Sequence, residues 1–148
     1  EQQVVLLSLG IQGISEKSDK SELLGVQIPG SDRSTFIEYS FNAKLGIKGE
    51  DVKVERIAEN RYRVSIPKFV FIGYDNPTFK LAAEDNGVLS WVTPEIDPTE
   101  MINSLLNDST QAEYISSNEE LLKDQSRVFY SSIISSVDPT IVTEFEFN

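Results

Sequence analysis

The hydrophobic pattern of this chain changes its period, and the change decides the fold class. Residues 35–43 alternate between apolar and polar side chains, as expected of a strand with one face exposed to water. Over residues 98–137, apolar side chains instead recur every three or four positions, which is the spacing of an amphipathic helix. Alternation returns at residues 140–147. Strands, a helical block and a closing strand predict an α+β fold with a mostly antiparallel, twisted sheet.

Turn residues separate the predicted strands. The strands are placed near residues 3–14, 35–43, 51–57, 61–67, 77–83 and 140–147. Residues 51–57 and 61–67 are expected to form a hairpin, and Pro67 ends it because proline has no N–H to donate to a ladder. Further turn signals lie at Gly73 and at residues 75–77.

The start of the helical region carries three concordant signals. Asp97 can cap the helix, Pro98 suits its first position, and Glu100 completes a capping box. Asp138 is expected to end the region, because it precedes a proline and therefore avoids the helical conformation. The polar run at residues 107–110 leaves one long helix and two shorter helices both open.

The length of the chain suits a single domain. Its 148 residues, 1–148, are enough to build a core. The polar segment 15–34 has no clear period and is expected to be a flexible loop. The chain starts at Glu1 rather than at a methionine, so we expect it to be a processed or trimmed form of a longer protein.

Composition and charge exclude several classes of function. The chain has no cysteine and no histidine, which excludes disulfides, thiolate chemistry, Ser-His-Asp triads and histidine-based zinc sites. The net charge is −11, and residues 81–148 carry 13 acidic side chains against two basic ones. Phosphate backbones require the opposite sign, so we expect no nucleic-acid partner.

Two glycines in the octet "KLGIKGED" raise the question of an anion-binding loop. A phosphate loop needs a glycine-rich turn between a strand and a helix, and here a strand follows. We therefore interpret Gly46 and Gly49, like Pro67, as structural turn residues. A positive φ or a bulge at either glycine would support this interpretation.

Other candidates for chemistry lack the context that they need. Ser65 and Lys68 have the Ser-x-x-Lys spacing of some hydrolases, but they lie at a strand end and not on a helix. Paired carboxylates occur at Glu84/Asp85, Glu119/Glu120 and Glu144/Glu146. None of these pairs is predicted to converge across a cleft, as acid–base catalysis requires. We expect no catalytic residue, no metal site and no cofactor.

Aromatic side chains are densest between residues 69 and 91. Most such residues belong to a core, but tyrosine and tryptophan at a rim suit protein or ligand contact. Phe71, Tyr74 and Trp91 are therefore the candidate contact surface.

One long segment resembles a known family. "FIEYSFNAKLGIKGEDVKVERIAENRYRVSIPK" is similar to the central signature of the bacterial domain-of-unknown-function family numbered 4230. The matching positions are Gly46, Ile47, Val52, Val54, Val64, Ile66 and Pro67. The downstream "YDNPTFKLAAEDNGVLSWVTPEIDPTEM" is also similar, and the resemblance covers roughly residues 4–137. Leu45 and Lys48 depart from the family's usual alanine and acid.

This resemblance sets the functional expectation. Members of the family carry a hydrophobic N-terminal helix before this domain and no catalytic motif, which implies a single-pass membrane anchor and an extracytoplasmic domain. We expect a non-enzymatic domain that acts through contact with an unknown protein partner or through self-association. The alternative is a small-ligand binding module with a pocket between sheet and helix, near Tyr74 and Trp91. A carboxylate-based hydrolase is the second alternative.

Overall fold

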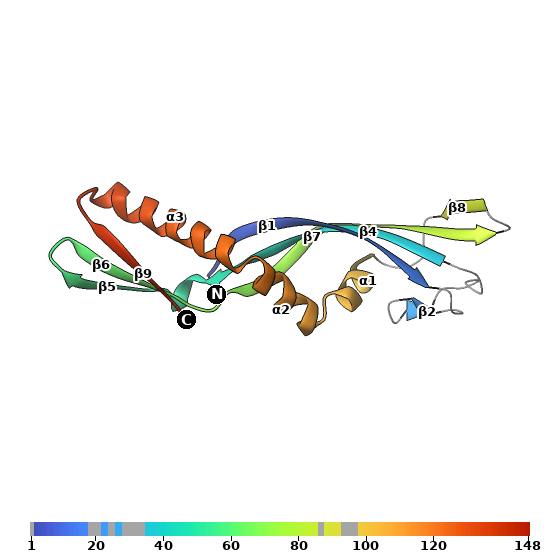
Figure 1. The fold of residues 1–148 in the computed structure, drawn as a ribbon, viewed down its shortest axis with the longest axis horizontal. Helices are drawn as coiled ribbons and strands as arrows, with labels where there is room; N and C mark the ends of the chain where they lie inside the picture. The colour runs from blue at the N-terminus through green and yellow to red at the C-terminus, as the bar shows by residue number, and fades with distance from the viewer. Residues whose placement is uncertain (1, 18–21, 24–25, 28–34, 86–87, 93–97) are drawn as a thin grey trace. The chain divides into compact units, whose positions relative to one another are not determined.

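The computed structural model describes residues 2–17, 22–23, 26–27, 35–85, 88–92 and 98–148, and its fold is α+β, as predicted (Figure 1). In chain order the elements are β1 (Gln3–Lys17), β2 (Glu22–Leu23), β3 (Val26–Gln27), β4 (Thr35–Lys48), the 3₁₀ turn η1 (Gly49–Asp51), β5 (Lys53–Ala58), β6 (Arg61–Ile66), β7 (Val70–Asp85), β8 (Val88–Val92), α1 (Pro98–Leu105), α2 (Asp108–Ser117), α3 (Glu119–Val137) and β9 (Val142–Phe147). Each of the six predicted strands has a counterpart.

The segment predicted as a flexible loop, residues 15–34, is only partly described. Residues 15–17 belong to β1, and β2 pairs antiparallel with β3. The rest of this segment lies outside the described residues, as does Asp97, the predicted helix cap. The helical region does begin at Pro98, with Glu100 in its first turn.

One sheet has the strand order β1-β4-β7-β8. Gly10 of β1 lies beside Asn42 of β4, and Gly13 lies beside Tyr39, so these two strands run in opposite directions. β7 and β8 also pair antiparallel, with Ala82 opposite Trp91. The mostly antiparallel sheet is thus confirmed.

β7 is longer than predicted, because the turn signals at Gly73 and at residues 75–77 do not end it. The strand runs from Val70 to Asp85 without a break. Asn76 adopts a φ of 52° inside it. Asparagine tolerates this left-handed conformation, and a proline inside a strand usually sits at such an irregularity.

β4 also runs past its predicted end, so Gly46 lies inside a strand and not in a turn. The corner predicted for this segment is η1, which begins at Gly49. Neither glycine has a positive φ. The reason for a glycine at position 46 is close approach: a Cβ there would collide with the carbonyl oxygen of Val4 and would lie 2.7 Å from Cδ1 of Ile72.

A second sheet has the order β5-β6-β9. β5 and β6 form the predicted antiparallel hairpin, and β9 returns to pair parallel with β6. Val64 of β6 therefore lies between Val54 and Phe145, on one face of the sheet. Ile66 is opposite Phe147 on the same face, because side chains alternate along a strand.

The described chain divides into two compact units. The first consists of Glu1–Leu9, Lys44–Gly73 and Ala112–Asn148, and the second of Gly10–Ala43 and Tyr74–Gln111. In the first unit, Ile47, Val64 and Ile66 are fully buried, and Val4, Leu6, Val52, Phe69, Tyr130, Ile134, Phe145 and Phe147 pack against them. The buried apolar residues of the second unit are Ile37, Phe41, Ala43, Phe79, Leu81, Ala82, Met101, Ile102 and Leu106.

The helical region is three helices. Asn107 separates α1 from α2, and its Oδ1 accepts hydrogen bonds from the backbone N (2.9 Å) and Oγ1 (3.1 Å) of Thr110. This is the geometry of an N-cap, so the polar run at residues 107–110 starts a new helix. Asn118 separates α2 from α3, and its Nδ2 donates to the carbonyl oxygen of Tyr114 at 2.7 Å.

We predict that Gly46→Ala destabilises the protein by about 1–3 kcal/mol, because the new methyl group has no room beside a backbone oxygen. Gly73→Ala is the matched control, since a Cβ at that position meets nothing within 4 Å. Removing a strand glycine there should leave stability unchanged or raise it by up to about 1 kcal/mol. Urea unfolding followed by circular dichroism measures both changes. Equal effects of the two substitutions would contradict the close-approach explanation.

Candidate functional site

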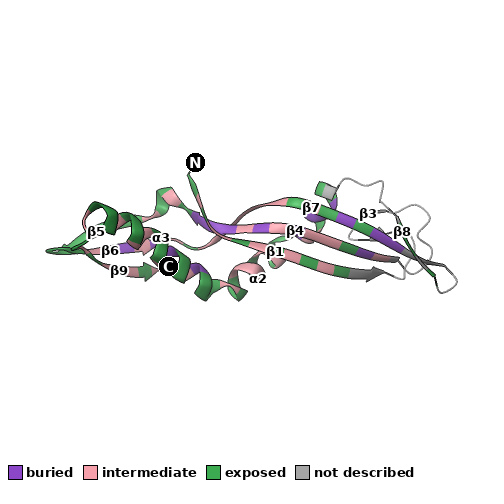
Figure 2. Ribbon diagram, turned by 90° about the horizontal axis from the view of Figure 1, so that it is seen from above, coloured by how far each residue is buried: buried purple, intermediate pink, exposed green. Residues whose placement is uncertain are grey.

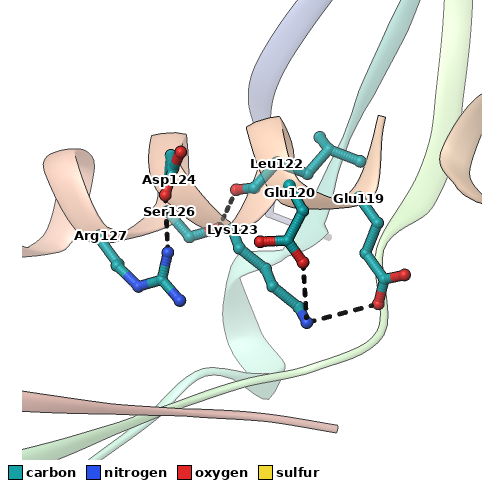
Figure 3. Close-up of polar contacts among 7 residues, drawn as sticks. All are labelled: Glu119, Glu120, Leu122, Lys123, Asp124, Ser126 and Arg127. Atoms are coloured by element: carbon teal, nitrogen blue, oxygen red, sulfur yellow. Dashed lines mark hydrogen bonds and ion pairs between the residues drawn. The ribbon is translucent and has the colours of Figure 1, made fainter. Parts of the chain in front are cut away.

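The candidate site is the exposed face of α3, the longest helix. Charged side chains stabilise its first half: Lys123 Nζ lies 3.6 Å from Glu119 Oε1 and 3.8 Å from Glu120 Oε1 (Figure 3). Asp124 and Arg127 form a further pair at 2.7 Å. Such pairs at three- and four-residue spacing support a helix. Acids in the first turn also suit the positive end of the helix dipole.

One row of α3, with a spacing of four residues, faces the β5-β6-β9 sheet. Leu122 and Ser126 are fully buried, and Tyr130 and Ile134 pack against the core of the first unit. Ser126 donates its hydroxyl hydrogen bond to the carbonyl oxygen of Leu122 at 2.8 Å (Figure 3). Its buried polar atom is therefore satisfied. Burial raises the pKa of the Tyr130 phenol above 10.0.

The basic side chains of α3 lie over an aromatic ring of the sheet. Lys123 Nζ is 5.5 Å and the Arg127 guanidinium carbon 5.0 Å from the centre of the Phe147 ring. Both cations are thus in cation–π range of this ring as well as in ion pairs. The charged side chains of α3 therefore make ion pairs and cation–π contacts within the first unit.

The next row of α3, displaced by one residue, is exposed and largely apolar. It contains Leu121, Phe129, Ile133 and Val137, with exposed fractions of 43%, 40%, 47% and 81%, and Val128 beside them is 61% exposed. We call these five residues the outer row. Gln125, Ser132 and Ser136 lie between them and are also exposed. Figure 2 shows exposed stretches along α3. From Val128 to Val137 this face carries no charged side chain, whereas Asp124 and Glu120 lie one and two turns before Val128 at its edge.

An apolar groove of about 240 Å³ adjoins the outer row. Its lining residues are Val54, Tyr62, Ile133, Ile134, Val137 and Ile141. Val54 is 52% exposed. It lies opposite Val64, on the face of the sheet that α3 covers, but the helix leaves this position of the edge strand open. The exposed apolar surface thus extends from the helix onto β5.

The predicted contact residues do not form one surface. Phe71 is half-buried in the first unit, whereas Tyr74 and Trp91 belong to the second. Tyr74 donates its hydroxyl hydrogen bond to Asn103 Oδ1 at 3.2 Å, and its ring meets Phe41 edge-on. Trp91 is 55% exposed on β8. Tyr74 is therefore engaged in local packing, and Trp91 is the more accessible of the two.

Among the residues that the structure describes, the candidates for catalysis do not form the convergent pairs that acid–base or Ser-Lys chemistry requires. Ser65 lies on the sheet face opposite to Val64 and Ile66, whereas Lys68 borders a hollow beside α2. Glu119 and Glu120 share Lys123, and Glu144 pairs with Arg61 at 3.0 Å. The side chains of Glu84 and Asp85 lie outside the described residues. Among the described residues, no three acidic side chains form a group suited to a metal ion.

The amide of Gly49 is also occupied. It donates to the carbonyl oxygen of Gln2 at 2.9 Å, so it serves the backbone and is not directed at an anion site. The segment around Gly46 and Gly49 thus joins strands, which agrees with its interpretation as structure.

Comparisons with known proteins add no assignment: no family model, curated protein or solved structure matches this chain. No helix in the described part of the chain is long and apolar enough to cross a membrane.

Sequence reasoning missed the outer row, although its signal was present. Apolar residues occur in α3 at positions 121 and 122, at 128 and 129, and at 133 and 134. Neighbouring residues on a helix point about 100° apart, so such doublets indicate two adjacent rows and not one. The sheet takes up Leu122 and Ile134, whereas their neighbours Leu121 and Ile133, and both members of the doublet at 128 and 129, are left exposed.

The end of α3 generates a pH prediction. Asp138 Oδ1 accepts hydrogen bonds from Thr140 Oγ1 (2.6 Å) and from the backbone N of Thr140 (2.9 Å). These bonds hold the pKa of the Asp138 carboxyl below its usual 3.8. Because the folded-state pKa is depressed, the stabilisation is fully present above the unfolded pKa of about 3.9 and is lost as pH falls through the folded value.

We therefore expect Asp138→Ala to lower the melting temperature at pH 7, and the difference from the wild type to shrink well below pH 4. Glu146→Ala, which removes an exposed carboxylate from β9, controls for the change in net charge. Melting curves over a pH series test this. A difference that stays constant down to acid pH would show that the ionised carboxylate contributes nothing.

Proposed function

We propose that this domain is not an enzyme and acts through protein–protein contact, with the outer row of α3 as its contact surface. The observation that carries the proposal is the arrangement of five exposed apolar side chains on one helix face, which carries no charge from Val128 to Val137. Single exposed apolar residues are normal on any surface, but a contiguous apolar patch marks an interaction site. The adjoining apolar groove enlarges this patch.

The composition supports a surface selected for contact. The chain has 25% charged residues and a net charge of −11, yet the second half of the 19-residue helix, residues 128–137, carries no charged side chain. Depletion of charge with a central aromatic residue is typical of the middle of a protein interface. Phe129 occupies this central position, and its ring contacts Tyr130 edge-on with a centroid distance of 5.0 Å.

The alternative function, a small-ligand binding module, has one observation in its favour, although the hollow concerned lies in the first unit and not near Tyr74 and Trp91, where the pocket was predicted. A hollow of about 360 Å³ is lined by Lys68, Phe69, Ala112, Ile115, Ser116, Glu119 and Asn148. This volume lies at the low end of ordinary ligand sites. A small molecule that raises the melting temperature of the wild type, but not of Ala112→Leu, would support this alternative over protein contact. The substitution places a larger side chain in the wall of the hollow.

The membrane-anchored, extracytoplasmic setting is also part of the proposal. It rests on the resemblance to the domain-of-unknown-function family alone. A contact surface directed away from an anchor would suit such a setting.

Site-specific photo-crosslinking tests the contact surface. A benzophenone amino acid at Val128, within the outer row, should give a discrete covalent adduct in intact cells that produce the protein. The matched control places it at Glu120, whose side chain is 85% exposed two turns before Val128, at the charged start of the same helix and outside the apolar patch. We expect no discrete adduct from the control. Absence of an adduct at position 128, or equal yields at both positions, would overturn the proposal.

A further inference from the structure

The outer row has a spacing that matches itself when it is reversed. Leu121, Phe129 and Val137 follow one another at intervals of eight residues, with Ile133 and Gln125 at the positions midway between them. A second α3 laid antiparallel across Phe129 would place Leu121 opposite Val137 and Phe129 opposite Phe129. The row is thus self-complementary about a two-fold axis at Phe129, which is what a symmetric dimer requires.

The charges of α3 favour the same arrangement. All of its charged residues lie in its first half, from Glu119 to Arg127, and residues 128–137 carry none. An antiparallel partner therefore sets the charged half of each helix beside the neutral half of the other. A parallel partner would set acid beside acid. Antiparallel helix dipoles add a further favourable term.

Other occupants fit less well. Helices that lie on membranes carry lysine and arginine along their polar face, whereas the two basic residues of α3 are ion-paired and lie over Phe147. A different protein selected by charge would have to compete for Asp124 and Glu120, the acidic side chains at the edge of the outer row, which already pair with Arg127 and Lys123. A copy of the same chain needs only the apolar match.

We propose that two copies of this chain bind one another through the outer row of α3, antiparallel and with Phe129 on the two-fold axis. This inference rests on the proposed function and names the partner. Residues 121, 125, 129, 133 and 137 form a ridge with a spacing of four residues. Two such ridges pack into one another at a crossing angle of about −50°, the commonest class in globular proteins. The closest contact then lies at Phe129 on the axis, with Gln125 of one copy beside Ile133 of the other, and the helices diverge toward Leu121 and Val137.

The first test measures mass against concentration by sedimentation equilibrium. We expect a monomer–dimer equilibrium whose dissociation constant rises more than about tenfold in Phe129→Ser, because each copy loses a buried ring. Val128→Ser, at a more exposed position, should weaken the dimer without threatening the fold. Val142→Ser, which removes an equally exposed apolar side chain from β9, is the control and should leave the constant unchanged. A monomer at all concentrations would overturn the inference.

The second test determines the orientation. Because the chain has no cysteine, any disulfide reports the introduced positions. Mixed Gln125→Cys and Ile133→Cys chains, one of them tagged, should give a disulfide-linked heterodimer under mild oxidation. Gln125→Cys chains alone should give little disulfide-linked dimer, because the antiparallel arrangement keeps the two copies of position 125 apart. A strong Gln125→Cys homodimer with no mixed product would indicate parallel helices and contradict the proposed axis.

The two proposals fail in different ways. If the protein is monomeric but the benzophenone at Val128 still links a protein of another mass, the contact surface stands and the partner is not a second copy. If neither dimer nor adduct forms, both proposals fall.

Discussion

The parallel pairing of β6 with β9 is the constraint on which the first unit depends. β9 enters the sheet only after α3 has ended, so the helix must return along the sheet for the pairing to form. The register then sets Phe145 opposite Val64 and Phe147 opposite Ile66. These aromatic side chains cover the β6 core residues on the face that α3 packs against. A shift of one residue would turn both phenylalanines to the open face.

The same register decides which side chains of α3 pack on the sheet. Phe147 lies beneath Lys123 and Arg127, so the basic residues of the helix are held over the sheet. The row from Leu122 to Ile134 fills the remaining space above Val64 and Ile66. A sheet of three strands, one of them an exposed edge, offers no surface for a second apolar row. The outer row is thus a consequence of covering a small sheet with a long helix.

Local chemistry predicted much of this fold. The hairpin of β5 and β6, the alternation of β9 and the helix start at Pro98 all follow from residues whose conformational preferences are strong. Tertiary contacts overrode weaker signals. Gly46 reads as a turn residue, but the approach of Val4 requires a glycine inside the strand. Residues 75–77 read as a turn, but Asn76 absorbs the irregularity through a single positive φ and β7 continues.

The candidate site was hard to predict for a related reason. An apolar residue on a helix indicates that its side chain is buried. Whether it is buried within the chain or against a partner depends on how much of the helix the sheet is wide enough to cover. Aromatic density pointed instead to Phe71, Tyr74 and Trp91, although Tyr74 is engaged by Asn103 and Phe41. In α3 the doublets Leu121/Leu122 and Ile133/Ile134 carry more information than any of these residues alone, because one member of each packs on the core and the other is exposed. One row of the helix folds the chain, and the row beside it remains available for a partner.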